Sequence, residues 1–106
     1  MELKDFQELS KRTLPHDTTF KEDLSNMCLG IHGEGGEVVD IIKKYLYQGH
    51  DLNMDHIKEE LGDMMFYIVN LANLINIDME EVLQLNFEKL CKRYPNGFKI
   101  EDSINR

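Results

Sequence analysis

Apolar residues recur at helical spacing along most of this chain. The clearest stripe lies in residues 54–75, where the intervals are three and four residues. Its members are Met54, Ile57, Leu61, Met64, Ile68, Leu71 and Ile75. Such a stripe covers one face of an α-helix and predicts a buried seam. Near the N-terminus, Leu3, Phe6 and Leu9 predict a shorter amphipathic helix that ends before Pro15, because proline cannot continue a helix.

A second long helix is predicted to begin after Thr19. The run Thr19-Phe20-Lys21-Glu22 has the form of a capping box, in which the Thr19 and Glu22 side chains satisfy free backbone N–H groups of the first turn. Gly49 marks the expected end of this helix. Its apolar positions are Leu24, Cys28, Ile31, Val38, Ile42 and Tyr45.

Four glycines, at positions 30, 33, 35 and 36, lie in the middle of this predicted helix. Together they cost on the order of 3 to 4 kcal/mol relative to alanine in a helix interior. Either the chain breaks into a loop there, or it stays helical and the glycines let another helix or a ligand approach closely. We favour the helix, because the apolar spacing stays in phase from Ile31 to Val38.

A fourth helix is predicted from Asp78, an N-cap residue, to the Pro95-Asn96-Gly97 turn. The polar tail, residues 99–106, is expected to be loosely held. No segment alternates with period two for long enough to form a strand. The sequence therefore predicts an all-α fold, an antiparallel helical bundle of about four helices that oligomerises through helix packing.

Composition narrows the functional classes. A chain of 106 residues predicts one domain, residues 1–106, and a net charge of −8 argues against a nucleic-acid partner. The apolar runs are too short to cross a membrane and the N-terminus lacks the apolar core of a signal peptide, so we expect a cytoplasmic protein. Cys28 and Cys91 form no metal or redox motif and are expected to be buried free thiols.

Two acidic couplets carry the candidate chemistry. Glu34 and Glu37, and likewise Glu60 and Asp63, are three residues apart, so each couplet lies on one helix face beside an apolar seam. Four converging, partly buried carboxylates repel one another and need a counter-charge, and Mg²⁺ prefers oxygen ligands. The alternative is an ordinary exposed acidic face. The flanking glycines, and the absence of Lys or Arg four residues from Glu34, Glu37 or Asp63, favour the metal site.

A basic stripe complements the acidic couplets on the fourth predicted helix. Asn86, Lys89 and Arg93 share one face, either as a solvated surface or as a phosphate-binding set. Other sites are disfavoured: the glycine-rich run lacks the P-loop pattern, and no Glu-x-x-His pair supports a di-iron centre. The four histidines have no metal-ligand spacing and are interpreted as surface or loop residues.

Three segments together resemble the MazG-like nucleoside triphosphate pyrophosphohydrolases of the all-α NTP pyrophosphatase superfamily. They are Leu29-Gly30-Ile31-His32-Gly33-Glu34-Gly35-Gly36-Glu37-Val38-Val39-Asp40, Glu59-Glu60-Leu61-Gly62-Asp63 and Asn86-Phe87-Glu88-Lys89-Leu90-Cys91-Lys92-Arg93-Tyr94-Pro95-Asn96-Gly97-Phe98. The resemblance covers roughly residues 20 to 98, and its combined motifs are specific. The chain departs from the family in its extra glycine within the first couplet and in its lack of tryptophan.

The resemblance implies hydrolysis of nucleoside triphosphates, with (d)NTPs expected, at the α–β phosphate bond. The products would be a nucleoside monophosphate and pyrophosphate, which suits housecleaning of the nucleotide pool. It also implies a homodimer or homotetramer. A non-catalytic nucleotide-sensing or protein-interaction module with the same fold is the alternative.

The same resemblance implies roles for particular residues. Mg²⁺, with Mn²⁺ as a substitute, would be held by Glu34, Glu37, Glu60 and Asp63. From the mechanism rather than the resemblance, we take Glu34 and Glu37 as the catalytic carboxylates and prefer Glu37 as the general base, because a carboxylate not fully used in coordination can activate water. The substrate-binding residues would be Tyr67, Asn86, Lys89 and Arg93.

Overall fold

All the helices predicted from the apolar spacing are present in the computed structural model, which describes residues 1–106. The elements are α1 (Leu3–Leu9), the 3-10 helix η1 (Ser10–Thr13), α2 (Phe20–Tyr47), α3 (Met54–Leu74), α4 (Met79–Arg93) and α5 (Ile100–Ile104). The structure has no named strand, so the all-α class is confirmed. The tail that was expected to be loosely held forms the short helix α5.

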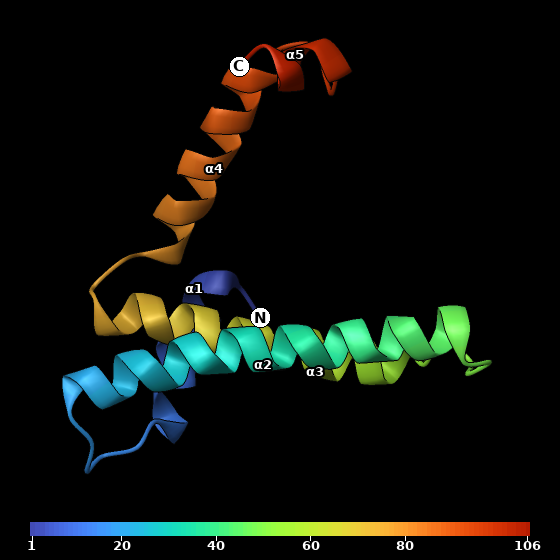
Figure 1. Cartoon of the computed structure of the whole chain (residues 1–106). Coiled ribbons are helices and arrows are strands. Elements are labelled where there is room, and N and C mark those ends of the chain that lie inside the picture. The colour runs from blue at the N-terminus through green and yellow to red at the C-terminus, as the bar shows by residue number, and fades with distance from the viewer.

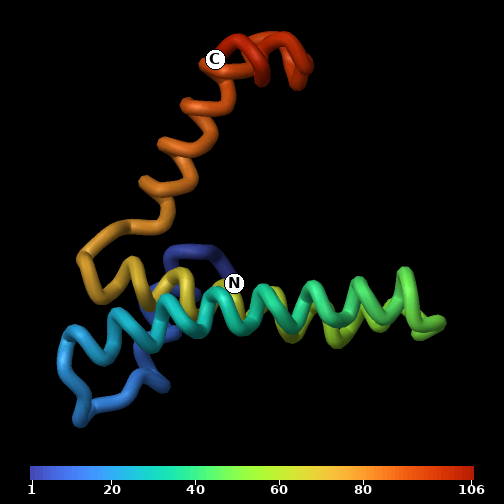
Figure 2. The backbone as a smooth tube through the Cα atoms, viewed as in Figure 1, coloured from blue at the N-terminus to red at the C-terminus, as the bar shows by residue number.

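The two longest helices, α2 and α3, lie side by side as an antiparallel pair (Figure 1). The backbone trace shows α1 and η1 lying against one end of this pair (Figure 2). α4 contacts α1 and then rises away from the pair, with α5 at its far end. The helical bundle within one chain is therefore built from α2, α3 and α1, while α4 projects from it.

The helix boundaries follow local capping chemistry. The capping box at the start of α2 is confirmed, because the Thr19 side chain accepts from the Glu22 N–H and the Glu22 carboxylate accepts from the Thr19 N–H, both at 3.2 Å. Asp78 caps α4 by accepting from the Glu80 N–H at 3.0 Å. Gly49 follows the end of α2 with φ +72°, a left-handed conformation that glycine adopts without a steric penalty.

α2 runs unbroken through its glycine-rich centre, which confirms the helical interpretation of that stretch. Two of the four glycines lie close to α3. A Cβ at Gly35 would be 3.7 Å from the Met64 side chain, while a Cβ at Gly30 would overlap the ring of Tyr67. Those at Gly33 and Gly36 would meet nothing within 4 Å. Close helix approach therefore explains Gly30 alone. A distance of 3.7 Å is an ordinary contact, so nothing in the structure requires glycine at positions 33, 35 or 36.

The core is small and lies where α1 and the start of α4 meet the C-terminal half of α3. Its buried members are Val69, Ala72 and Met79, and partly buried side chains from α1 and α3 pack around them. The predicted seam of α3 is wrong in its N-terminal half, where Met54 and Leu61 are 58% and 48% exposed. Only α2 covers that half of α3, so one narrow contact cannot bury the whole stripe.

The buried row of α2 also differs from the prediction. Met27 and Ile41 are buried, whereas Ile42 and Tyr45 are exposed. The row that faces α3 is thus the one that also contains Glu34. The two cysteines are free, but the expectation that they are buried was wrong, since both are exposed.

A polar network ties α1 to the turn between α3 and α4. The Gln7 side chain donates to the Asn73 side chain and to the Ile77 carbonyl, and it accepts from the Met79 N–H at 3.0 Å. Asn73 donates back to the Gln7 carbonyl and to the side chain of Asn70, which is fully buried. Gln7 therefore holds the segment from which α4 departs.

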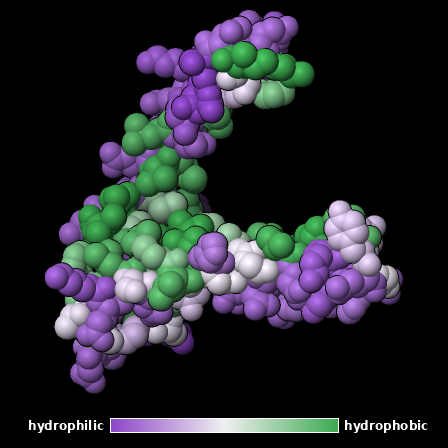
Figure 3. All heavy atoms as spheres, in the orientation of Figure 1, coloured by the Kyte–Doolittle hydropathy of each residue, from purple (hydrophilic) through white to green (hydrophobic).

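Large apolar side chains remain uncovered on the outer faces of this chain. On α4 they include Leu83, Leu85 and Phe87, and apolar surface runs from the helix pair onto α4 (Figure 3). Seven of the 106 residues are buried, so the single chain encloses little apolar volume. None of its helices combines the length and apolar character needed to span a membrane.

Candidate metal and substrate site

The antiparallel packing of α2 against α3 brings three carboxylates together. Glu34 comes from α2, and Glu60 and Asp63 come from one face of α3, one turn apart. One carboxylate oxygen from each of the three lies within 4.8 Å of the others. We call Glu34, Glu60 and Asp63 the acidic cluster. Two of its members are separated from the third by more than 25 positions in the sequence, so only the helix pair assembles it.

The cluster is electrostatically costly as it stands. Glu34 and Glu60 are half-buried, and the Glu60 side chain is 13% exposed. A side-chain hydrogen bond with Glu60 raises the pKa of Glu34 to about 7; burial and the negative charges of Glu60, Asp63 and Glu37 act in the same direction. The Lys–carboxylate ion pairs of the chain all lie elsewhere, at Glu8, Asp40 and Asp55.

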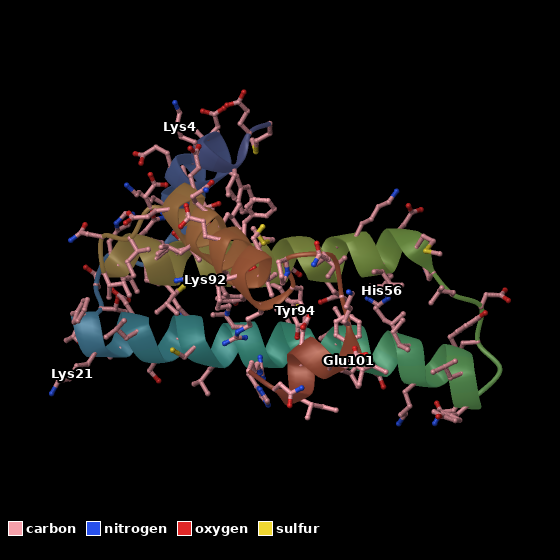
Figure 4. The ribbon with its side chains drawn as sticks, turned by 90° about the horizontal axis from the view of Figure 1, so that it is seen from above. Lys4, Lys21, His56, Lys92, Tyr94 and Glu101 are labelled. Atoms are coloured by element: carbon pink, nitrogen blue, oxygen red, sulfur yellow. The ribbon has the colours of Figure 1, made fainter.

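His56 is the nearest basic side chain to the cluster. Its Nε2 lies 3.3 Å from a Glu60 carboxylate oxygen, one turn away on α3. Seen from above, its side chain lies between α2 and α3 (Figure 4). His56 therefore contacts the Glu60 carboxylate from the same face of α3 and helps to orient it.

The donor set fits a hard divalent cation. Carboxylate oxygens are the ligands that Mg²⁺ and Mn²⁺ prefer, and Mg²⁺ retains several waters when it binds through a few carboxylates. Three carboxylates that repel one another would lose that repulsion on binding such an ion. The cluster lacks cysteine and has no histidine beyond His56 beside it, which disfavours a site built for softer metals.

Glu37, which the sequence placed with the other three, is not brought into the acidic cluster. It is exposed on α2, one turn beyond Glu34. Its charge nevertheless reaches its neighbours, because it contributes to the raised pKa of Glu34 and to that of Lys44. The pKa of Lys44 is raised mainly by its hydrogen bond to Asp40. Glu37 therefore lies at the solvent edge of the cluster with its carboxylate outside the set of three.

Tyr67 lies one helical turn away from the acidic cluster along the helix pair. It follows Asp63 by one turn on α3 and its ring packs against Gly30, which precedes Glu34 by one turn on α2. The side chain is half-buried and makes an edge-to-face contact with Phe66, with ring centroids 5.3 Å apart. Tyr67 thus borders the acidic cluster on the side of the core.

The predicted basic stripe is not brought to the acidic cluster within one chain. Asn86 and Lys89 are exposed and Arg93 is half-buried, all on α4. In Figure 4 Lys92 overlaps the helix pair, but the side view in Figure 1 shows that α4 has risen away from it. The lining of a shallow hollow on α4 includes Lys89 and Lys92 together with Leu85 and Phe87. Positive charge and apolar surface therefore occur together on the projecting helix.

Comparison with known proteins places this chain in a family. The model of the MazG nucleotide pyrophosphohydrolase domain matches residues 22–98. The chain belongs to this family. The MazG match begins near the start of α2 and ends after α4, so it contains the acidic cluster, Glu37, Tyr67 and the basic stripe. It leaves out α1, the helix that holds the turn before α4.

A phage protein is also similar to this chain. The chain is 36% identical over 89 residues to the protein called Gene 37 protein of Mycobacterium phage L5. That match covers 80% of this chain and 78% of the phage protein. No solved structure matches the chain.

Two residues beside the acidic cluster were given no role from the sequence. His56 was grouped with the surface histidines, although its position four residues before Glu60 placed both on one helix face. Gly30 was seen only as one of several glycines. Nothing in the local sequence distinguishes Gly30 from Gly33, because the contact with Tyr67 depends on how α2 and α3 pack.

Proposed function

We propose that this protein hydrolyses nucleoside triphosphates at the α–β phosphate bond in a Mg²⁺-dependent reaction. The observation that carries the proposal is the acidic cluster, in which three carboxylates from two helices, none of them paired with Lys or Arg, converge within a MazG domain. Such a cluster is unfavourable unless a cation and an anionic substrate complete it. Mn²⁺ is expected to replace Mg²⁺ because it takes the same ligands.

The carboxylates would divide into two roles. Glu34, Glu60 and Asp63 would hold the ion, which when bound supplies positive charge for the triphosphate and makes a water molecule more acidic. Glu37 is exposed beside the cluster and is not one of its three members. A carboxylate in that position is free to accept a proton, which supports Glu37 as the general base. Glu34 would then contribute to catalysis by holding the ion rather than by proton transfer.

The reaction balances as a hydrolysis. Glu37 takes a proton from water as the water oxygen forms a bond to the α-phosphorus, and the bond from that phosphorus to the bridging oxygen breaks. Pyrophosphate leaves with that oxygen, and the nucleoside monophosphate carries the oxygen from water. The departing group gains negative charge, which Lys89 and Arg93 would stabilise, while Asn86 would contribute a neutral hydrogen bond.

The separation of the basic stripe from the acidic cluster supports a homodimer or homotetramer. Within one chain α4 points away from α2 and α3, so Lys89 and Arg93 would have to come from a second copy to reach a triphosphate held at the cluster. A second copy would also cover the apolar residues that the single chain exposes. They include Val39, Leu46 and Tyr47 on α2, with Val39 65% exposed.

Pyrophosphate release tests the proposal. The protein is incubated with Mg²⁺ and a panel of canonical and modified nucleoside triphosphates in water enriched in ¹⁸O. We expect pyrophosphate without orthophosphate, and the ¹⁸O label in the monophosphate, because attack occurs at the α-phosphorus. Label in the pyrophosphate would place the attack at the β-phosphorus instead.

Matched variants make the assay specific to the cluster. Glu60→Gln should abolish pyrophosphate release, whereas Glu59→Gln should not, since Glu59 is the exposed neighbour outside the cluster. No product from any nucleotide, at any Mg²⁺ or Mn²⁺ concentration, would contradict the proposal. A module that binds nucleotides without turnover would then remain.

A further inference from the structure

Gly30 and Tyr67 make the closest approach between α2 and α3 at any glycine of the chain. A Cβ built on Gly30 would lie 2.2 Å from Cδ1, 2.3 Å from Cε1 and 2.4 Å from Cγ of the Tyr67 ring. Contacts this short do not occur, so any side chain at position 30 must displace the ring or separate the helices. The other six glycines show no comparable overlap.

The three distances also give the orientation of the ring. Cγ, Cδ1 and Cε1 are consecutive ring atoms, and they are almost equally far from the position of the absent Cβ. A point that lies in the plane of the ring, outside Cδ1, would be much farther from Cγ and Cε1 than from Cδ1. The point must therefore lie above the ring, so Tyr67 rests face-on against the α2 backbone at Gly30. That face is closed to any other partner.

The position of this contact relates it to the acidic cluster. Along α2, Glu34 lies one turn after Gly30; along the antiparallel α3, Asp63 lies one turn before Tyr67. The Gly30–Tyr67 contact and the acidic cluster are thus successive levels of the same helix pair. A shift of the Tyr67 ring would alter the wall beside a bound substrate without changing any member of the cluster.

We propose that Gly30 is a positioning residue that seats Tyr67 face-on beside the acidic cluster. Tyr67 then contacts the nucleoside part of the substrate without stacking a base on the face that Gly30 covers. This inference rests on the proposed function for its substrate. The packing relationship itself can be tested without turnover.

The decisive variant is Gly30→Ala, with Gly33→Ala as its matched control on the same helix. Gly33 has nothing within 4 Å of its absent Cβ, so alanine there should raise the melting temperature through its higher helix propensity. We expect Gly30→Ala to lower the melting temperature and to raise KM about tenfold, because small displacements of a positioning group are costly. The Mg²⁺ concentration for half-maximal activity should not change, since the cluster is intact.

A double-mutant cycle of Gly30 and Tyr67 distinguishes a role of Gly30 in positioning the Tyr67 ring from a need for glycine at position 30 whatever side chain faces it. In a Tyr67→Ala background the overlapping ring is gone, so Gly30→Ala should now raise the melting temperature and leave KM unaltered. If Gly30→Ala alone fails to fold, recovery of folding in the double variant supports the inference. Equal damage by Gly30→Ala in both backgrounds would overturn it.

The experiment also distinguishes this inference from the proposed function. If the wild-type protein releases no pyrophosphate, the proposed function fails, but the melting-temperature cycle still decides whether Gly30 seats Tyr67. Binding of a non-hydrolysable nucleotide then replaces KM as the readout of substrate contact. Unchanged nucleotide affinity in a folded Gly30→Ala variant would overturn the positioning role.

Discussion

The carboxylates of Glu34 on α2 and Glu60 on α3 come within 4.8 Å of each other, and their interaction raises the pKa of Glu34 to about 7. Two carboxylates this close repel each other unless one of them carries a proton. Near neutral pH the metal-free site therefore exchanges a proton readily. The same proton must leave when a divalent cation takes its place.

Stability of the metal-free protein should fall as the pH rises from about 5 to 8. The folded pKa of Glu34 is about 7 against an ordinary value of 4.5, so its contribution is complete below 4.5 and lost as the pH rises through 7. Asp40 and Glu22 have the opposite effect on stability at acidic pH. Hydrogen bonds lower their pKa values, so the stability that they contribute is lost as the pH falls. Melting temperatures measured in a chelator check this window. Glu34→Gln should flatten the slope, and an unchanged slope would contradict the account.

Magnesium should stabilise the protein by mass action on the folded state. At an ion concentration about 100 times the Kd, the free energy of unfolding should increase by about 2.7 kcal/mol. The increase should shrink below pH 7, where the proton on Glu34 competes with the ion. Thermal melts with and without Mg²⁺ measure it. Glu60→Gln should remove the shift and Glu59→Gln should preserve it; equal shifts in both variants would place the ion elsewhere.

Glu37→Gln should abolish turnover while leaving the metal-free protein no less stable. Glu37 is exposed, has no hydrogen bond or ion pair in the structure, and adds negative charge beside Glu34. Removing it relieves repulsion without opening a cavity. Because it lies outside the cluster, the Mg²⁺-induced thermal shift should largely remain. A large loss of stability in the metal-free protein would contradict this account of repulsion, and complete loss of the Mg²⁺ shift would show that Glu37 is a ligand.

Gln7→Ala should destabilise the protein by about 1 to 3 kcal/mol, since it leaves polar groups at the α3–α4 turn without their partner. The groups affected are Asn73, the Ile77 carbonyl and the Met79 N–H. Chemical denaturation gives the change in the free energy of unfolding. Gln84→Ala is the matched control, because its bond to Glu88 is exposed and within one helix; it should cost about 0.5 kcal/mol or less. Equal losses would mean that Gln7 does not hold the turn.

The apolar outer face of α2 should mediate assembly. Sedimentation is expected to show a dimer or tetramer for the wild-type protein, and Val39→Lys should shift it toward the monomer by burying a charge in the interface. Ser25→Lys, at an exposed polar position of the same helix, is the control. A monomer at all concentrations would require the basic residues of α4 to act from within the same chain.

Local interactions allowed the sequence to determine the helices. Apolar spacing and capping depend on residues three or four positions apart, so the start of α2 at Thr19, the cap at Asp78 and the end near Gly49 were all predictable. The helical centre of α2 was predicted for the same reason. The motifs also sufficed to predict the MazG family, which the family match confirms.

Only the tertiary structure decided which of the predicted residues meet. The register of α2 against α3 brings Glu34 to Glu60 and Asp63 but leaves Glu37 outside, although both glutamates share the same local pattern. The same register places the Tyr67 ring against Gly30 rather than against another glycine. The direction of α4 follows from its contacts with α1. The apolar spacing within one helix cannot predict such contacts between helices. Helices form through neighbours in sequence, whereas a site between helices depends on packing between distant segments.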